Sequence, residues 1–534
     1  MTGTADKKSA PRVLVADEMS PRAVDILRER GMAVDVATGF TAAELKDRIG
    51  LYDALAVRSA TKVTADVLKS ALRLRVIGRA GIGVDNVDVP EATRRGIVVM
   101  NTPSGNAVTT AEHTIAMILA LARQIPRADA STRKGKWEKA RFVGVELTGK
   151  TLGLIGCGNV GAVVADRAQG LKMKVIAFDP FLSPERAEKM GVAKVTLDEL
   201  LARADVISLH VPLTDATRNI IDKAALAKMK PGVRVINCAR GGLIVEAELK
   251  AAIESGRVAG AALDVFATEP PADNPLFTLD QVIVTPHLGA STAEAQENVA
   301  IQVAEQIAEF LATGAVINAV NMPPVSAEDA PKLRPYLRLV QQLGSFAGQM
   351  TRTAVKAVTI EYEGHAAALD TRLVTAAALQ GLLAPLVDQV NLVSAASVAK
   401  ARGIEVTEIK RTEPRAYSTL VRLSVTTETQ TRGLAGTLFD GERPRIVEIK
   451  GIAIDAELGP HMLYVTNEDR PGFIGALGTA LGEAGINIAT FHLGRSGAGQ
   501  QALALIEVDQ AVDESVLERL RALPHVLQVR ALWF

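Results

Sequence analysis

The chain has 534 residues, 48% hydrophobic and 22% charged, a length and composition typical of a globular protein with several domains. Lys plus Arg and Asp plus Glu are both 60, so the formal net charge is zero. This balance argues against nucleic acid or an anionic membrane as a global partner.

The start, MTGTADKKSAPR, has no apolar segment behind its charges, so we expect no secretory signal. No apolar run reaches the roughly 18 to 20 residues that a membrane helix needs. The two cysteines, Cys157 and Cys238, each lie beside an apolar run. We therefore expect a cytoplasmic protein with no disulfide and no metal site.

From Val13 to about Met322, short β-rich runs alternate with amphipathic helical runs such as 111–123 and 247–255. Strand-like runs include VLVAD, ALAVRS, TLGLIGCG, KVIAFDP and VRVINCA. This alternation predicts βαβ units and doubly wound parallel sheets, which makes the fold class α/β. The runs are almost continuously apolar, as expected when helices cover both faces of a sheet.

A Pro-containing break at 321–335 marks a boundary, and the pattern changes beyond it. Residues 336–455 combine alanine-rich helices with strands, which predicts an α+β module without a catalytic constellation. The last segment gives the order βαββαβ, with GRSGAG at 494–499 as the hairpin between its middle strands. That order predicts a ferredoxin-like domain.

The stretch GLIGCGNVG contains a G-x-G-x-x-G motif at Gly156, Gly158 and Gly161. An apolar strand leads into it, a helix leaves it, and the next strand ends at Asp179. These glycines permit a tight turn, close approach of the pyrophosphate, and close helix–strand packing. Asp179 would accept hydrogen bonds from the ribose hydroxyls and repel a 2′-phosphate, so NAD is the predicted cofactor.

Three polar residues follow apolar runs in the same region: Arg240 after VRVINCA, Glu269 after AALDVFAT, and His287 after VIVTP. Ligands of doubly wound sheets bind at the carboxyl ends of the strands, where we expect the three to converge. The guanidinium would hold a carboxylate, the imidazole would exchange a hydroxyl proton, and the glutamate would orient the imidazole. Together they form a set for oxidising a 2-hydroxy acid.

Each residue also has a structural alternative. A single arginine at a strand end is more often part of an internal ion pair, because an unpaired buried charge is costly. Arg240 therefore either holds a carboxylate of this protein or binds one from outside. Of the other histidines, His113 is expected to pack in a helix and His210 to border the cofactor without acting as a base.

The blocks VRVINCARGGLIVEAEL, GAALDVFATEP and VIVTPHLGAST resemble the signatures of the D-isomer specific 2-hydroxyacid dehydrogenases. The C-terminal unit, with DRPG at 469–472 and GIN at 485–487, resembles an ACT domain. This domain order is similar to the long-form members of the family. Those members oxidise 3-phospho-D-glycerate to 3-phosphohydroxypyruvate in L-serine biosynthesis, as oxidoreductases.

The resemblance implies two Rossmann-like or flavodoxin-like lobes around a cleft. Residues 1–104 and 297–321 would form the substrate-binding lobe, and residues 105–296 the NAD-binding lobe. An intervening α+β domain would follow at 322–455, and a regulatory ACT domain at 456–534. The resemblance also implies a homotetramer.

Family positions further imply site residues. The implied substrate contacts are Arg58, Arg79, Gly81, Ile82, Gly83 and Asn106. The implied cofactor contacts beyond the glycines are Asn159, Val160, Thr217, Ala239, Asp264 and Gly289. A basic stretch gives candidates for the substrate phosphate, which a partner subunit delivers in some members: Lys134, Lys139 and Arg141. The alternative for this stretch is a solvated helix face.

Asn467, Asp469 and Asn487 stand where family members with an effector site hold serine, which implies feedback inhibition as a hypothesis. Asn467 departs from the aromatic residue or histidine expected at its place. Two other functions stay open. One is a dehydrogenase for an unphosphorylated 2-hydroxy or 2-keto acid, against which the basic stretch counts. The other is a nucleotide-sensing binding protein on the same fold, since fold alone does not fix function.

Overall fold

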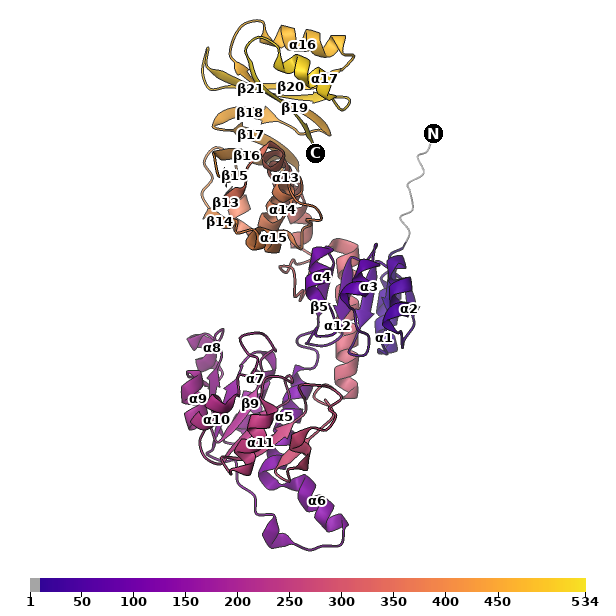
Figure 1. Cartoon of the computed structure of the whole chain (residues 1–534), viewed down its shortest axis with the longest axis vertical. Helices are drawn as coiled ribbons and strands as arrows, with labels where there is room; N and C mark the ends of the chain where they lie inside the picture. The colour runs from indigo at the N-terminus through magenta and orange to yellow at the C-terminus, as the bar shows by residue number, and fades with distance from the viewer. Residues whose placement is uncertain (1–9) are drawn as a thin grey trace.

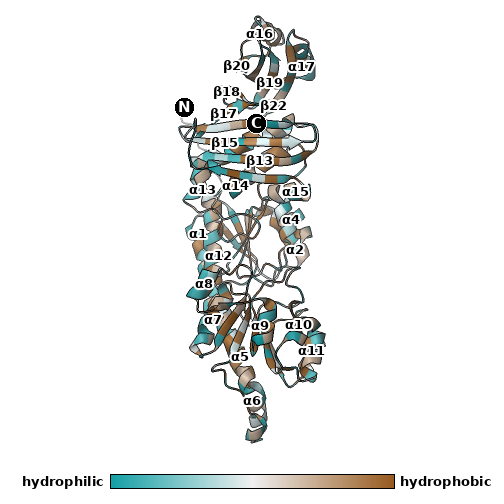
Figure 2. Ribbon diagram, turned by 90° about the vertical axis from the view of Figure 1, so that its left-hand side faces the viewer, coloured by the Kyte–Doolittle hydropathy of each residue, from teal (hydrophilic) through white to brown (hydrophobic). Residues whose placement is uncertain are grey.

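The computed structural model describes residues 10–534. The first nine residues of the chain, on which the expectation of no secretory signal largely rests, lie outside this range. Four sheets lie one after another along an elongated molecule, with the C-terminal domain at one end (Figure 1). In the second lobe, brown hydrophobic strands lie between helices that carry teal polar residues (Figure 2).

The first lobe is a parallel sheet with the strand order β2-β1-β3-β4-β5. Its strands are β1 (Arg12–Val15), β2 (Ala33–Val36), β3 (Ala54–Val57), β4 (Val76–Arg79) and β5 (Val98–Asn101). Its helices are α1 (Pro21–Glu29), α2 (Ala42–Arg48), η1 (Ile49–Leu51), α3 (Ala65–Lys69), α4 (Val89–Arg94) and the returning α12 (Ala293–Thr313). A Cβ on Gly78 would lie 2.5 Å from Val303, so this glycine lets α12 pack closely on β4.

The second lobe is a larger parallel sheet, in the order β12-β11-β10-β9-β6-β7-β8. Its strands are β6 (Thr151–Ile155), β7 (Lys174–Phe178), β8 (Ala193–Lys194), β9 (Val206–Leu209), β10 (Val233–Asn237), β11 (Val258–Leu263) and β12 (Val282–Val284). Its helices are α5 (Ala107–Arg123), α6 (Ile125–Arg133), η2 (Lys139–Arg141), α7 (Asn159–Gly170), α8 (Pro184–Lys189), α9 (Leu197–Arg203), α10 (Lys223–Lys228), α11 (Glu246–Glu254) and η3 (Pro275–Thr278). The order reverses between β6 and β9, which is where such sheets bind ligands.

The third domain has the sheet order β14-β13-β15-β16-β17-β18. Its elements are α13 (Asp329–Met350), β13 (Val355–Gly364), η4 (His365–Ala368), α14 (Thr371–Leu383), α15 (Ala395–Ala401), β14 (Glu405–Arg411), β15 (Thr419–Thr427), β16 (Thr431–Phe439), β17 (Arg443–Ile449) and β18 (Ile452–Ala456). Helices α13 and α14 approach closely, because a Cβ on Gly344 would lie 2.2 Å from the Ala378 carbonyl oxygen.

The C-terminal domain has the order β20-β21-β19-β22, with antiparallel pairing throughout. Its elements are β19 (His461–Glu468), α16 (Phe473–Glu483), β20 (Ile488–Arg495), β21 (Gln501–Val508), α17 (Glu514–Arg521) and β22 (Val526–Trp533). The predicted βαββαβ order and the hairpin between its middle strands are confirmed. The α/β lobes, the α+β intervening domain and this ferredoxin-like domain together confirm the predicted fold class.

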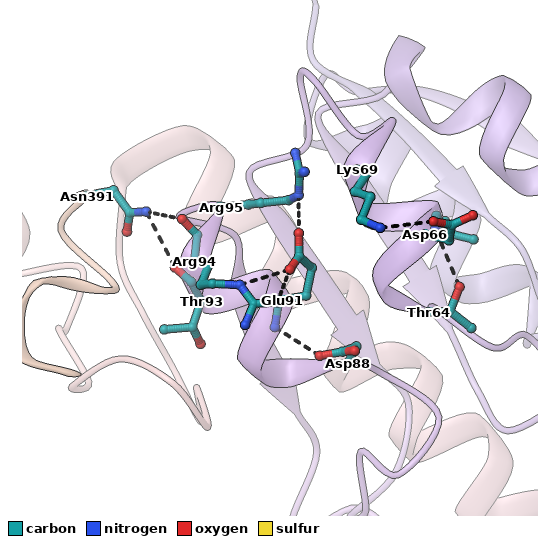
Figure 3. A network of polar contacts seen from close by, with 10 residues as sticks. Thr64, Asp66, Lys69, Asp88, Glu91, Thr93, Arg94, Arg95 and Asn391 are labelled. Atoms are coloured by element: carbon teal, nitrogen blue, oxygen red, sulfur yellow. Dashed lines mark hydrogen bonds and ion pairs between the residues drawn. The ribbon is translucent and has the colours of Figure 1, made fainter. Parts of the chain in front are cut away.

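A polar junction joins the third domain to the first lobe (Figure 3). The Asn391 side chain donates to the carbonyl oxygens of Thr93 and Arg94 at the end of α4, at 3.4 and 2.8 Å. On the same helix, the Glu91 carboxylate accepts hydrogen bonds from Arg94 and Arg95. The carboxyl end of α4 is therefore capped by another domain.

Both cysteines are buried and free, and burial raises the pKa of Cys157 to about 11 and of Cys238 to about 12. The thiols therefore stay protonated and behave as small apolar groups. None of the helices described over residues 10–534 combines the length and the apolar character that crossing a membrane requires.

Candidate active site

The predicted catalytic residues come from three neighbouring segments of the second lobe. Arg240 follows β10, Glu269 lies in the loop after β11, and His287 follows β12. These strands are parallel neighbours, so their carboxyl ends lie at one rim of the sheet. A cavity of about 520 Å³ opens beside this rim, lined by Phe266, Phe277, Glu269 and His287.

Glu269 and His287 form a direct pair, with 2.7 Å between Oε2 and Nδ1. The other carboxylate oxygen of Glu269 accepts the Phe266 amide at 3.0 Å, which fixes the carboxylate in the loop. Because Nδ1 faces the carboxylate, Nε2 is the ring nitrogen left for another partner. His287 has a φ of 56°, an uncommon conformation for a residue other than glycine, and such strain clusters at active sites.

The loop that carries His287 is held by Asp264, which is fully buried. Its carboxylate accepts hydrogen bonds from the Thr285 hydroxyl at 2.5 Å and from the Leu288 and Gly289 amides at 2.7 and 2.8 Å. Burial opposes ionisation, but these bonds and His113 outweigh it and lower the Asp264 pKa. The predicted cofactor contacts Asp264 and Gly289 are thus joined in one network that positions the catalytic loop.

Arg240 has a partner inside the protein. Its Nε donates to the Asp85 carboxylate of the first lobe at 3.1 Å, and its Nη1 donates to the Ala239 carbonyl oxygen at 2.6 Å. Asp85 is 67% exposed, so the pair lies at the open cleft. Both alternatives for Arg240 therefore hold in part: it pairs internally, and one edge of its guanidinium remains available to a ligand.

Two glycines follow Arg240 for different reasons. A Cβ on Gly241 would lie 1.7 Å from the Phe266 carbonyl oxygen, which leaves no room for any side chain. Gly242 has a φ of 79°, a conformation that glycine adopts without strain. The turn after β10 is thus pressed against the loop that carries Glu269.

Arg79, at the end of β4, is the most unusual charge in the cleft. Its Nε is buried without a hydrogen-bond partner, and within residues 10–534 no carboxylate lies at ion-pair distance from its guanidinium. Burial, together with the nearby Arg240, lowers the Arg79 pKa to about 10, so the side chain remains charged near neutral pH. A half-buried guanidinium without an ion-pair partner is partly desolvated, and an anionic ligand would offset that cost.

The glycine loop after β4 corrects one expectation about the substrate carboxylate. The Gly81 amide, predicted to donate to the substrate, already donates to the Thr102 hydroxyl at 2.7 Å. The amides of Ile82 and Gly83 make no hydrogen bond within the described part of the chain. The Ile82 and Gly83 amides are therefore the two that remain free to donate to a ligand. The Gly81 amide instead ties the loop to Thr102, directly after β5.

Two other predicted substrate residues come from different lobes, Arg58 from the first and Asn106 from the second. The Arg58 guanidinium donates to the Glu18 carbonyl oxygen at 3.1 Å, and its amide donates to the Asp17 carboxylate at 2.6 Å. Asn106 is buried at the start of α5, where its Oδ1 has no hydrogen-bond partner.

The residues present fit a dinucleotide at the turn after β6. Gly156 has a φ of 94°, and a Cβ there would lie 2.5 Å from the His210 carbonyl oxygen. A Cβ on Gly161 would lie 2.4 Å from the Gly156 carbonyl oxygen. Gly158 has open space where its Cβ would stand, at the start of α7, as a pyrophosphate requires.

The neighbouring predicted cofactor contacts are anchored by the protein itself. Asp179 accepts the Cys157 and Phe181 amides, both at 2.8 Å, which holds its carboxylate at the end of β7. The Thr217 hydroxyl closes its loop by donating to the Pro212 carbonyl oxygen at 2.6 Å. Asn159 donates to the Pro103 carbonyl oxygen at 3.2 Å, and Val160 follows in the first turn of α7.

His210 stands at the end of β9 beside this turn. Its Nε2 lies 2.9 Å from the Ser208 hydroxyl, and burial lowers the pKa of the imidazole to about 4. The ring therefore remains neutral across physiological pH. This agrees with the expectation that His210 borders the cofactor without acting as the base.

The basic stretch does not reach the site of its own chain. Figure 1 shows α6 extending from the outer end of the second lobe, away from the cleft. Arg141 pairs with Glu138 at 3.3 Å and lies 3.8 Å from Asp280, which precedes β12 and so marks the opposite edge of the sheet. Lys134 and Lys139 lie on the same exposed arm.

The three effector candidates lie near the end of β19, with Asn467 in the strand and Asp469 just after it, and just before β20, at Asn487. Asn467 is buried, with its Nδ2 bonded to the Glu468 carbonyl oxygen at 2.7 Å and its Oδ1 without a partner. Asp469 accepts the Gly499 amide at 3.1 Å, and Asn487 donates to the Asp509 carboxylate at 2.8 Å. The domain's own groups thus occupy part of the hydrogen-bonding capacity of each candidate.

Sequence reasoning missed two groups at the site. Asp85 had a signal, since it is an acid two residues after the last glycine of the loop. His113 was predicted to pack in a helix, but its Nε2 lies 3.3 Å from the Thr285 hydroxyl and 3.4 Å from Asp264. No sequence spacing indicates that contact, because α5 and the His287 loop are 172 residues apart along the chain.

Three family models match consecutive parts of the chain. Residues 115–289 match the NAD binding domain of the D-isomer specific 2-hydroxyacid dehydrogenases. Residues 332–450 match the D-3-phosphoglycerate dehydrogenase intervening domain, and residues 461–525 match the ACT domain. The predicted family resemblance and the predicted NAD cofactor are confirmed.

Curated relatives align over nearly the whole chain. D-3-phosphoglycerate dehydrogenase of Bacillus subtilis is 44% identical over 97% of this chain and 99% of its own length. The Archaeoglobus fulgidus enzyme of the same name is 45% identical over 97% of this chain and 98% of its own.

Solved structures match the two lobes. A glyoxylate reductase from Paecilomyes thermophila is 30% identical, with a TM-score of 0.55, over 58% of this chain and 98% of that one. D-lactate dehydrogenase from Aquifex aeolicus, complexed with NAD and lactic acid, is 27% identical, with a TM-score of 0.53, over 58% and 99%. Given its full-length relatives, the chain belongs to the D-3-phosphoglycerate dehydrogenase family, within the D-isomer specific 2-hydroxyacid dehydrogenases.

Proposed function

We propose that this protein oxidises 3-phospho-D-glycerate to 3-phosphohydroxypyruvate with NAD, the first step of the phosphorylated route to L-serine. The full-length relatives bear the name of that activity. One observation supports a phosphorylated substrate: Arg79 lies near Arg240, which binds Asp85, and no carboxylate within residues 10–534 lies at ion-pair distance from Arg79 itself. A site with this excess of positive charge suits a ligand with two anionic groups.

In the proposed reaction, the substrate carboxylate binds the free edge of Arg240 and the amides of Ile82 and Gly83. His287 takes the proton of the C2 hydroxyl on Nε2 while Glu269 holds Nδ1 and stabilises the charged imidazole. When bound, NAD supplies the acceptor for the hydride that leaves C2. C2 thus loses a hydride, its hydroxyl oxygen loses a proton, and the C–OH group becomes a C=O group.

The phosphate contacts are proposed from the remaining basic residues. Arg58 and Arg79 lie on the first-lobe side of the cleft, and Asn106 lies at the start of α5 in the second lobe. Lys134, Lys139 and Arg141 would reach a phosphate only in a neighbouring subunit, because they lie on the arm formed by residues 125–143. That arm exposes 87% of Trp137 and 76% of Val143, which supports self-association, and we propose the homotetramer expected of the family.

The proposed division of the chain is 1–104 with 297–321, 105–296, 322–455 and 456–534. The chain would pass from one lobe to the other near the starts of α5 at Ala107 and α12 at Ala293, which lie close to the proposed boundaries. We propose the cytoplasm as the compartment, consistent with two free, buried thiols.

The direct test compares substrates. We expect the purified protein to consume NADH with 3-phosphohydroxypyruvate far faster than with plain hydroxypyruvate, and Arg79→Ala to erase much of that preference. Removal of this one positive charge should change the rate of hydroxypyruvate reduction little, because that ketone has no phosphate. Equal use of both ketones by the wild type would favour the broader 2-hydroxyacid dehydrogenase function, and no turnover would favour a binding protein.

We propose L-serine as an effector of the ACT domain, through Asp469, Asn487 and the unsatisfied Oδ1 of Asn467. An orphaned buried amide oxygen supports a missing donor at this place, such as the ammonium group of an amino acid. We expect millimolar L-serine to lower turnover in the wild type and to lose this effect in Asn487→Ala. D-serine serves as the control, and turnover unchanged by L-serine would remove the proposal.

The two glycines of the dinucleotide turn give matched variants. Gly161→Ala places a methyl group against the Gly156 carbonyl oxygen, so we expect a lower melting temperature and lost NADH binding. Gly158→Ala meets only open space, so the protein should melt normally while its Kd for NADH rises on the order of tenfold, about 1.4 kcal/mol. Fluorescence titration and thermal denaturation measure both, and unchanged binding by Gly158→Ala would contradict the assigned pyrophosphate site.

A further inference from the structure

The loop that presents Asp85 is held rigidly against the first lobe. The neighbouring Asn86 side chain donates to the carbonyl oxygens of Arg58 and Thr61, at 2.8 and 2.7 Å. Asp88, three residues on, accepts the Glu91 amide at 2.9 Å and caps α4. The Asp85 carboxylate is thus placed at a fixed point of the cleft wall.

Two of the three guanidinium nitrogens of Arg240 are hydrogen-bonded within the protein. Asp85 occupies Nε, and the Ala239 carbonyl oxygen occupies Nη1. Nη2 is the remaining nitrogen, and it points at the glycine loop, since a Cβ on Gly83 would lie 1.8 Å from it. The same Cβ would lie 2.6 Å from the Asp85 carboxylate. Only glycine at position 83 therefore leaves room for Arg240 and Asp85 to meet beside this loop.

The Asp85–Arg240 ion pair should contribute little to the stability of the fold, and Asp85 should weaken the binding of an anionic substrate. Its members are 25% and 67% exposed, and ion pairs this open to solvent stabilise proteins little. A carboxylate beside the group that receives an anionic substrate also repels that substrate. A contribution of Asp85 to function must therefore come from geometry rather than from net attraction.

We propose that Asp85 is a positioning residue for the reaction. From the first lobe it holds Arg240 of the second lobe by Nε, across the cleft, so that Nη2 faces the Ile82 and Gly83 amides. The substrate carboxylate then meets donors from both lobes at one point, with Asp85 remaining on Nε. The inference rests on the proposed function, because it assumes that Arg240 receives the substrate carboxylate.

Steady-state kinetics of 3-phosphohydroxypyruvate reduction test this role in the full-length protein. Asp85→Ala should raise KM for the ketone by about 10- to 100-fold, as expected when a binding group loses its fixed orientation, with a smaller change in kcat. Asp85→Asn keeps an oxygen that accepts the Nε hydrogen, so it should recover most of the loss. KM for NADH and the melting temperature should match the wild type in both.

A charge-matched control separates positioning from the loss of a negative charge. Glu18→Gln removes an exposed carboxylate at the same rim of the first lobe, and it should leave KM unchanged. If Asp85→Ala fails to fold, Asp85→Ser takes its place with the same expected rise in KM. An unchanged or lower KM in Asp85→Ala, with normal wild-type turnover, overturns the inference alone. A wild type that does not reduce the ketone overturns the proposed function and this inference with it.

Discussion

Replacing His287 by alanine is expected to lower kcat by ~10² to 10⁴-fold, the usual contribution of a general acid–base group. The imidazole is the group that Glu269 orients, through the 2.7 Å contact to Nδ1, and Nε2 is its free nitrogen. Alanine leaves the substrate hydroxyl without a proton acceptor, while the dinucleotide turn after β6 is untouched. The Kd for NADH should therefore stay close to that of the wild type, and stopped-flow and titration measurements separate the two effects.

A second histidine–glutamate pair supplies the control. His525 lies 3.2 Å from Glu468 in the C-terminal domain, with exposure similar to that of His287, so His525→Ala removes an equivalent contact far from the cleft. It should leave kcat unchanged. Glu269→Gln should fall between the two, because the amide can still hold Nδ1 but no longer stabilises the charged ring. Near wild-type turnover in His287→Ala would show that the base lies elsewhere.

Arg240→Lys is expected to lower kcat/KM by ~10² to 10³-fold, comparable to losing a preorganised donor at a reacting anionic group. Lysine keeps the charge but carries a single ammonium group. It cannot hold Asp85, the Ala239 carbonyl oxygen and a substrate carboxylate along three edges of one plane, as the guanidinium can. The loss should fall on both KM and kcat, since the same group holds the substrate and polarises the developing ketone.

The matching substitution outside the site is Arg445→Lys. That guanidinium is as buried as Arg240 and also pairs with carboxylates, Asp455 at 3.2 Å and Glu457 at 3.6 Å. Its replacement should leave kcat/KM at the wild-type value. If Arg240→Lys behaved in the same way, a point charge would suffice and the assigned planar recognition would be wrong.

The parts of the site that depend on local sequence were predictable. Gly156, Gly158 and Gly161 lie within six positions, so their spacing alone fixes a tight turn at the end of a strand. The strand ends that carry Glu269 and His287 were predictable for a related reason, since neighbouring parallel strands end at the same rim. The Glu269–His287 contact follows from that geometry.

Contacts that cross between lobes were not predictable from the sequence. The Arg240–Asp85 pair joins residues 155 positions apart and depends on how the two sheets face each other. The Gly81 amide was assigned to the substrate because nothing in the sequence indicates that Thr102 takes it. The direction of the basic arm is likewise a property of the folded lobe, so composition predicted its charge but not its distance from the cleft.

The clamp of Asn391 on the end of α4 has a mechanical consequence. Because α13 follows α12 along the chain and Asn391 caps α4, the third and C-terminal domains are attached to the first lobe. Figure 1 places these domains in line beyond that lobe, away from the second. The third and C-terminal domains thus extend the first lobe on the side away from the second lobe, so any rotation of the first lobe would carry the C-terminal domain through a longer arc than the first lobe itself.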